Sequence, residues 1–180
     1  FQRFEVSEFA YTENIVTDNN NDIYIVGLFE GTLIIDSDTL IAETNQLNNM
    51  FIAKLNSDGD VQWTKQFGST ENDFAHDIAI DNNNNILMSG TVKGTVDFDG
   101  FQIEAGNISQ RFVLKCTENG IVQWVKIISG TVEAEKPFLD VDSQGNIYIA
   151  SSFQADIDYQ NAGASSNNVD VFLLKLNTNG

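Results

Sequence analysis

The sequence predicts an all-β protein built from tandem antiparallel units, and three recurring strings lead to this prediction. Strings of the form F-x-x-K begin at Phe51, Phe112 and Phe172, and strings that start with Asp and are rich in Asn or Gly begin at Asp18, Asp81 and Asp142. A third string reads GTLIID, GTVDFD and ADIDYQ, starting at Gly31, Gly94 and Ala155. The three strings keep one order and recur at roughly sixty residues, which indicates a structural repeat rather than biased composition.

Within each unit, the alternation of apolar and polar residues predicts four short strands. In the middle unit these are residues 76–81, 85–90, 112–116 and 121–128. The first two flank an Asn-rich turn that suits positive φ angles, and no segment carries the apolar spacing of an amphipathic helix. Four antiparallel strands per unit describe a β-propeller blade. A stacked β-solenoid is the alternative, although its coils are usually shorter.

The two tryptophans occupy the same place on the predicted fourth strand of their units. Val61, Trp63 and Phe67 share one face of that strand, and Trp124 is the counterpart of Trp63. A ring in this position could stack on a sugar. Because the position is fixed by the repeat and the face is apolar, we predict instead that both rings pack between blades.

The predicted architecture is one β-propeller segment spanning residues 1–180, with units at about 1–67, 68–128 and 129–180. The first unit starts with the tail of a preceding fourth strand, in which Phe4 aligns with Phe67, and the last unit is incomplete. About four to eight blades close a propeller, so we expect a partial ring that belongs to a longer propeller or is completed by other copies. Each unit has extra length between its second and third strands, which predicts a projecting hairpin or loop at 27–50, 90–111 and 151–171.

Composition and charge exclude several classes of protein. With 42% hydrophobic residues the chain is not a disordered tail, and its net charge of −17 disfavours binding to nucleic acids or anionic lipids. The acidic surface would suit cationic partners or divalent cations, although its simplest role is solubility. No apolar run is long enough for a membrane-spanning helix, and a single cysteine excludes an internal disulfide.

The candidate catalytic residues are few. His76, the only histidine, aligns with Glu13 and Pro137 of the sister units, and we predict a surface position beside a turn. Cys116 aligns with leucines of the other units and is predicted to be a small buried hydrophobic residue. Glycoside hydrolysis needs two carboxyl groups about 5–10 Å apart in a cleft, whereas several acids here recur in every unit, which favours structural roles. We therefore expect no catalytic residues and no enzyme activity.

The first Asn-rich turn begins like a calcium-binding loop. Residues Asp18 to Asp22 have the D-x-N-x-D spacing that begins a calcium loop. The sixth position, however, is Ile23 where that loop needs Gly, and the twelfth is Phe29 where it needs Glu. The motif therefore predicts a turn, and we expect neither a bound metal nor a cofactor.

At these repeated strings the chain resembles the SBBP-type repeat, a bacterial β-propeller repeat associated with seven-bladed rings. Its D-x-x-G-N-x-Y-x-x-G element is matched at Asp18–Gly27, Asp81–Gly90 and Asp142–Ser151. Its F-x-x-K-L-x-x-x-G-x-x-x-W element is matched at Phe51–Trp63 and Phe112–Trp124, and in part at Phe172–Gly180. Among the departures, Ser151 stands where the pattern has a strand-end glycine. The resemblance implies an extracytoplasmic scaffold or adhesin-like module and no catalytic residues.

These observations predict a non-catalytic, secreted or cell-surface β-propeller module that mediates interaction with a protein or a glycan. Its partners would also include the rest of a longer propeller or neighbouring chains, but no nucleic acid. One alternative is a purely structural spacer or passenger domain of a large surface protein or secretion-associated complex; a less favoured one is a carbohydrate-active enzyme. Variable loops on a rigid frame are common recognition sites, so the predicted binding residues are Phe98, Asp99, Phe101 and Tyr159.

Overall fold

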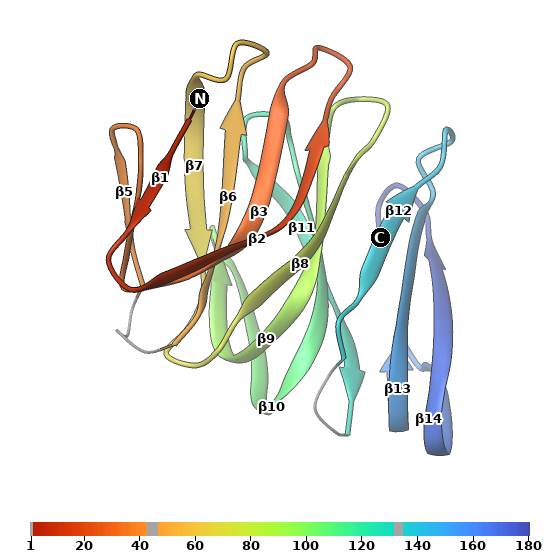
Figure 1. Ribbon diagram of the computed structural model, residues 1–180. Helices are drawn as coiled ribbons and strands as arrows, with labels where there is room; N and C mark the ends of the chain where they lie inside the picture. Colours follow the sequence, from red (N-terminus) through yellow and green to blue (C-terminus); the bar gives the residue numbers. More distant parts are fainter. Residues whose placement is uncertain (1, 43–46, 132–134) are drawn as a thin grey trace.

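The computed structural model describes residues 2–42, 47–131 and 135–180, and over these residues the chain is all-β and antiparallel (Figure 1). The strands are β1 (Phe4–Val6), β2 (Phe9–Thr17), β3 (Ile23–Glu30), β4 (Thr32–Ile35), β5 (Asp38–Ile41), β6 (Asn49–Leu55), β7 (Val61–Phe67), β8 (Phe74–Ile80), β9 (Ile86–Phe98), β10 (Phe101–Cys116), β11 (Val122–Gly130), β12 (Phe138–Val141), β13 (Ile147–Tyr159) and β14 (Ala162–Leu176). None of the described segments is a helix that could cross a membrane.

The strands form consecutive blades, as the repeat predicted. The first blade pairs in the order β2-β3-β6-β7, and the second in the order β8-β9-β10-β11. The third consists of β12, β13 and β14, with β14 on its outer edge at the right of Figure 1. The prediction of an all-β partial propeller built from antiparallel blades is therefore confirmed, and the described residues hold two four-stranded blades and one three-stranded blade.

Each blade carries a projecting hairpin between its second and third strands, which confirms the prediction for the extra length. In the first blade this hairpin is the separate pair β4–β5, and residues 43–46 of the predicted segment lie outside the described residues. In the other two blades, β9–β10 and β13–β14 continue outward as long ribbons. The first residues of the three turns, Asp36, Asp99 and Gln160, share a left-handed conformation, with φ angles of 55°, 53° and 50°.

The end of one fourth strand pairs with the hairpin of the following blade. At the junction of the second and third blades, Ser129 and Gly130 of β11 pair with Asp158 and Ile157 of β13. At the start of the chain, β1 pairs with β4 in the same way, with Phe4 opposite Ile35. Strand β1 therefore pairs with its hairpin as the end of β11 does with β13.

Apolar side chains fill the spaces between blades. Between the first and second blades, one cluster contains Tyr24 and Ile52 of the first blade together with Ile78 and Met88 of the second. Trp63 packs against this cluster and donates its indole N–H to the carbonyl of Glu118 at 3.2 Å, while Trp124 packs against the cluster between the second and third blades. The predicted inter-blade role of both tryptophans is confirmed.

Candidate functional site

The three recurring aspartates cap their own turns. Asp18 accepts hydrogen bonds at Oδ1 from the backbone amides of Asn20 and Asp22, at 2.8 and 3.0 Å. Asp81 and Asp142 make the same pair of bonds to the amides two and four residues later. The Asn146 side chain, with further hydrogen bonds from backbone amides, lowers the pKa of Asp142 to about 2. These bonds confirm the turn chemistry that the sequence predicted.

In two of the blades, a buried lysine on the third strand pairs with a carboxylate of the turn in its own blade. Lys115 lies 2.9 Å from Asp81, with side chains 8% and 3% exposed, and Lys54 lies 2.9 Å from Asp22. Burial opposes ionisation of Asp81, but hydrogen bonds from Asn85 and Lys115 outweigh it and hold the pKa of the carboxyl below its ordinary value. Because charged groups this deep are costly unless paired, we assign these lysines to the frame rather than to a ligand site.

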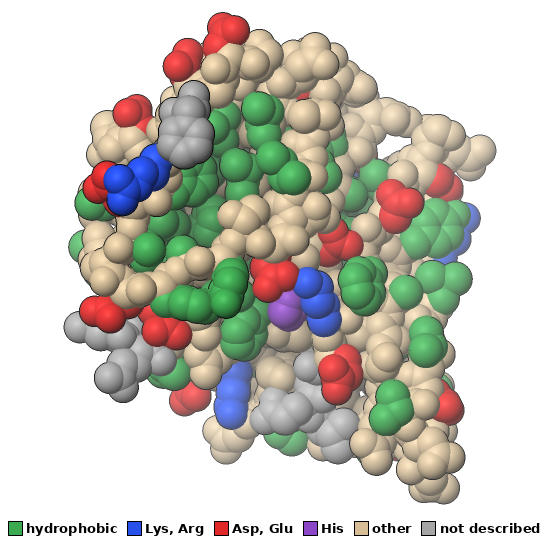
Figure 2. All heavy atoms as spheres, in the orientation of Figure 1, with side chains coloured by type: hydrophobic (Ala, Val, Ile, Leu, Met, Phe, Trp, Pro, Cys, Tyr) green, Lys and Arg blue, Asp and Glu red, His purple; other side chains and the backbone are tan. Residues whose placement is uncertain are grey.

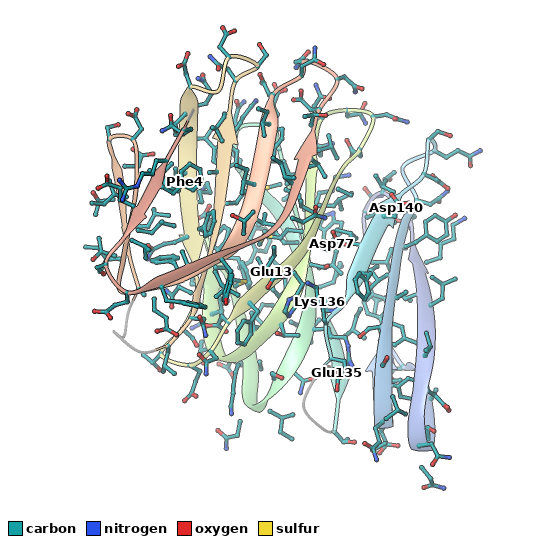
Figure 3. All side chains as sticks on the ribbon, viewed as in Figure 1. Phe4, Glu13, Asp77, Glu135, Lys136 and Asp140 are labelled. Atoms are coloured by element: carbon teal, nitrogen blue, oxygen red, sulfur yellow. The ribbon has the colours of Figure 1, made fainter. Side chains whose placement is uncertain are left out.

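The innermost strands of the three blades meet at one carboxylate (Figure 3). Asp77 of β8 accepts a hydrogen bond at Oδ1 from the Asn14 side chain of β2, and at Oδ2 from the backbone amide of Leu139 of β12, at 2.8 Å. A single side chain of the second blade therefore ties the first and third blades together. Sequence reasoning missed Asp77, because nothing in the repeat pattern marks this position.

Beside Asp77, an ion pair and a histidine occupy the same junction. Lys136 lies 2.6 Å from Glu13, so the two flanking blades also contact each other directly. The ring of His76 stacks on Phe74 with centroids 5.8 Å apart, and in Figure 2 it lies next to a cationic and an acidic side chain. Burial, reinforced by the charge of Lys136, lowers the pKa of His76 to about 4, against the opposing effect of Glu13 and Asp77.

This placement corrects the prediction for His76. The residue lies within strand β8, not beside a turn, and it is half-buried. Its Nε2 is 3.3 Å from the Thr91 hydroxyl, and its Nδ1 is buried with no hydrogen-bond partner among the described residues. A β-bulge between Ala75 and Asp77 shifts the strand register at this point, so simple alternation assigns the ring to the wrong environment.

Cys116 lies where the repeat placed it, on the apolar face of β10. Its side chain is buried in the cluster between the first two blades, and burial raises the pKa of the thiol to about 12. At neutral pH the thiol is protonated and the His76 imidazole is uncharged. Over residues 2–42, 47–131 and 135–180, no group of three or more His, Cys, Asp or Glu side chains is arranged to hold a metal ion.

The four predicted binding residues fall into different environments. Phe98 is fully buried, with its ring centroid 5.1 Å from those of both Phe67 and Phe112. The prediction that Phe98 belongs to an exposed recognition surface is therefore wrong, because the hairpin folds back against the preceding blade. Asp99 and Phe101 lie together at the turn of that hairpin and are partly exposed, the carboxylate of Asp99 pairing with Lys65.

Tyr159 lies on the equivalent hairpin of the third blade, away from Asp99 and Phe101. It is half-buried and lines a cavity of about 310 Å³ together with Ile128, Ile157 and Phe172. Burial raises the pKa of its hydroxyl. The structure thus brings Asp99 and Phe101 together at one hairpin turn, places Phe98 in the core and places Tyr159 at the wall of a cavity.

Arg111 is a second residue that sequence reasoning missed. Its side chain is 2% exposed, its Nε donates to the Ser151 hydroxyl at 3.1 Å, and its guanidinium lies over the Phe172 ring. The sister units have Met50 and Val171 at this position. A charged residue at a repeat position where the other two units have apolar residues was the signal that could have identified Arg111.

Comparison with known proteins supports the repeat assignment. Residues 62–94, which run from β7 into β9, match the family described as the SBBP beta-propeller repeat. An uncharacterized WD repeat-containing protein of Acanthamoeba polyphaga mimivirus is 23% identical to the chain over 194 aligned positions. That alignment covers 91% of this chain but 14% of the viral protein, so the chain spans only a small part of this relative's length.

Proposed function

We propose that this chain, which carries an SBBP β-propeller repeat, is a non-catalytic protein-interaction module whose ligand contacts are made by the hairpin tips, residues 36–38, 99–101 and 160–162. The observation that carries the proposal is that three tips of different sequence begin with the same left-handed backbone conformation. Their first residues, Asp36, Asp99 and Gln160, all adopt positive φ. Variable residues on a rigid frame are where recognition concentrates.

Of the three tips, the one at residues 99–101 has the chemistry most suited to binding. Phe101 is 39% exposed, and the neighbouring Asp99 carboxylate is 47% exposed while it contacts Lys65. Gly100 between them has a φ of 96° and open space around it. An exposed ring beside a carboxylate suits a partner segment that offers an apolar side chain next to a Lys or Arg, and the net charge of −17 favours such a segment at long range.

The state of the reactive groups supports a non-catalytic role. A nucleophile needs a nearby base or a lowered pKa, whereas the pKa of the Cys116 thiol is raised to about 12 by burial. His76 is held neutral by burial and contacts a threonine hydroxyl within the fold. The recurrent aspartates are engaged by backbone amides of their own turns.

Panning a random peptide display library against the purified chain tests the proposal. We expect the selected peptides to be enriched in Lys or Arg beside apolar residues, and to lose binding to Phe101→Ala and Asp99→Asn. Ile121→Ala is the matched control, because Ile121 is 64% exposed but lies outside the tips. Peptides that bind Phe101→Ala and Asp99→Asn as well as the original chain would refute the tip assignment. A glycan array probed with the same variants tests the glycan form of the proposal.

We also propose that the module acts outside the cytoplasm, at a bacterial cell surface. The resemblance to surface-displayed repeat proteins supports this, and the lone thiol is buried, so an oxidising environment would not expose it to disulfide exchange. Protease added to intact cells that make the protein should digest it. Digestion only after lysis would contradict the proposed location.

A further inference from the structure

The junction between the first and second blades lacks a backbone pairing that is present at two equivalent places. Ser129 of β11 pairs with Asp158 of β13, and β1 pairs with β4 in the same way. The repeat places Gly68, just after β7, opposite Asp97 of β9 in this register. Over residues 2–42, 47–131 and 135–180, however, β7 pairs with β6 alone. The junction with the missing pairing lies inside the chain, with a four-stranded blade on each side.

A buried carboxylate joins the two strands where backbone pairing does not. Asp73 is 0% exposed and accepts hydrogen bonds from the backbone amides of Ser69 at 2.6 Å and Lys93 of β9 at 2.9 Å. The first unit has Ala10 at the repeat position of Asp73. Because Asp73 engages the Ser69 amide, that amide does not bond to the backbone of β9, and the strands stay apart beyond this point.

A cavity of about 220 Å³ occupies the unpaired stretch, and we call it the junction slot. It lies where the arrow of β7 ends beside β9 in Figure 1. Its walls come from both blades, with Asn49, Phe67 and Gly68 from the first and Thr95, Asp97 and Gln102 from the second.

Asn49 brings an unpaired polar atom to the slot. The residue is 1% exposed, and its Oδ1 is buried with no hydrogen-bond partner in the described part of the chain. In the second blade the equivalent residue is Gln110, whose amide accepts from the Gly130 backbone N–H at 2.7 Å and donates to the Gly130 carbonyl at 3.2 Å. Asn49 is one methylene shorter, and the counterpart of Gly130 is Ser69, whose amide is held by Asp73. A buried acceptor without a partner is costly, which favours a ligand that donates to it.

Asp97 is a second acceptor, on the opposite wall of the slot. Its Oδ1 accepts from the Gly100 amide at 2.5 Å, and no other described side chain engages the carboxylate. Asp97 lies opposite Gln102 in the hairpin, whereas Phe101 lies opposite Phe98. Since neighbouring positions of a strand point to opposite faces, the slot and Phe101 lie on different faces of the hairpin.

We propose that the junction slot binds a guanidinium group, the side chain of an arginine on a partner protein. The two unengaged groups are both acceptors and one is a carboxylate, so a cationic donor complements them, and the net charge of −17 attracts it at long range. A guanidinium presents five donors in a planar fork and can reach both walls, whereas an ammonium is a compact point charge. The Phe67 ring offers an apolar wall for the stem of the arginine. The proposal does not depend on the hairpin tips, because Phe101 faces away from the slot.

Titration of the purified chain with N-acetyl-arginine amide, followed by two-dimensional NMR, tests the proposal. We expect saturable shifts of the Gly68 backbone amide and the Asn49 side-chain amide. The citrulline analogue has the same shape without the charge and should bind roughly tenfold more weakly, as should the lysine analogue. Equal binding of the arginine and citrulline probes would overturn the proposal. Tighter binding of a methyl glycoside or of free arginine would also overturn it, because the ligand would then be a sugar or a small molecule.

Variants of the chain provide the second arm. Asp97→Asn keeps an oxygen for the Gly100 amide but removes the charge, and it should weaken binding of the arginine probe roughly tenfold. Asp58→Asn is the matched control, because it removes the same charge from an exposed turn at the other end of β7 and should bind as the original chain does. Asn49→Leu removes the buried acceptor at similar volume and should also weaken binding.

Unchanged binding by Asp97→Asn and Asn49→Leu, or an equal loss in Asp58→Asn, would show that the slot is not the site. Phe101→Ala should bind the arginine probe normally, so failure of the slot and failure of the hairpin-tip proposal can be told apart. Loss of the probe in Phe101→Ala would assign it to the tip and overturn the proposal.

Discussion

Lys115 and Asp81 lie 2.9 Å apart in a nearly solvent-free position, and Lys115 also donates to the carbonyl of Thr178 at 3.2 Å. One ammonium group therefore neutralises the turn of its own blade and contacts the last turn of the next. Lys54, at the same strand position of the first blade, pairs with Asp22 of its own turn, and Asp22 is 22% exposed. A charge at the same strand position in the first two blades thus has a structural function that hydrophobic residues alone would not perform.

Replacing Lys115 with Met should lower the free energy of unfolding by about 3 kcal/mol, because the Asp81 carboxylate stays buried without its cation. Lys54→Met is the matched control and should cost less, since Asp22 keeps contact with water. Urea denaturation followed by circular dichroism measures both. The double variant Lys115→Met with Asp81→Asn should recover much of the loss; no recovery would contradict the assignment of the loss to an unpaired charge.

His76 should make the fold sensitive to mild acid. Its pKa is about 4 in the folded protein against 6.5 for the ordinary side chain, so the unfolded chain binds more protons between these values. Stability from this residue is therefore complete above about pH 6.5 and is lost as the pH falls toward 4, by up to about 3 kcal/mol at 1.4 kcal/mol per unit. Between pH 6.5 and 4, the free energy of unfolding of the original chain should fall more steeply with falling pH than that of His76→Gln. Parallel profiles would refute this prediction.

Phe98 and Phe101 are three residues apart but should behave differently. Phe98→Ala removes a fully buried ring from the stack with Phe67 and Phe112, and we expect a loss of about 3–5 kcal/mol in unfolding free energy. Phe101→Ala removes a ring that is 39% exposed and should cost less than about 1 kcal/mol. Thermal and urea unfolding of the two variants under one condition compares them directly.

Gly90 should not tolerate a side chain. A Cβ atom there would lie 2.0 Å from the Phe74 carbonyl oxygen and 2.6 Å from the Phe112 ring, and Gly27 has the same surroundings. Gly90→Ala should therefore destabilise the protein by about 3 kcal/mol. Gly59→Ala is an informative control, because nothing lies within 4 Å of that position and its strain is backbone strain alone. Equal losses in the two variants would show that the ring contact is not the cause.

The sequence was sufficient for the repeat, the strands and the projecting hairpins, because these depend on local alternation and on turn residues. It was not sufficient for Phe98 and His76. Alternation tells which residues share a strand face, but it does not tell what covers that face. The hairpin of one blade folds onto the preceding blade, and a bulge shifts β8 beside His76; both are tertiary effects with no local signature.

Ser151 shows how a departure from the repeat was accommodated. It stands where the repeat pattern has a strand-end glycine, and its hydroxyl accepts a hydrogen bond from Arg111 and lies 3.0 Å from the carbonyl oxygen of Lys136. In the first two blades the same position is a glycine covered by an aromatic ring. In the third blade, a hydrogen bond between Arg111 of the second blade and Ser151 of the third replaces this contact between a glycine and a ring.

The pairing of β11 with β13 and of β1 with β4 has a mechanical consequence. Because β11 begins in the second blade and ends by hydrogen bonding to β13, the second and third blades cannot be pulled apart by separating their apolar faces alone. Tension along the polypeptide would have to rupture backbone bonds at these crossings before the sheets parted. A chain under load at its two ends should therefore extend in discrete steps rather than peel gradually.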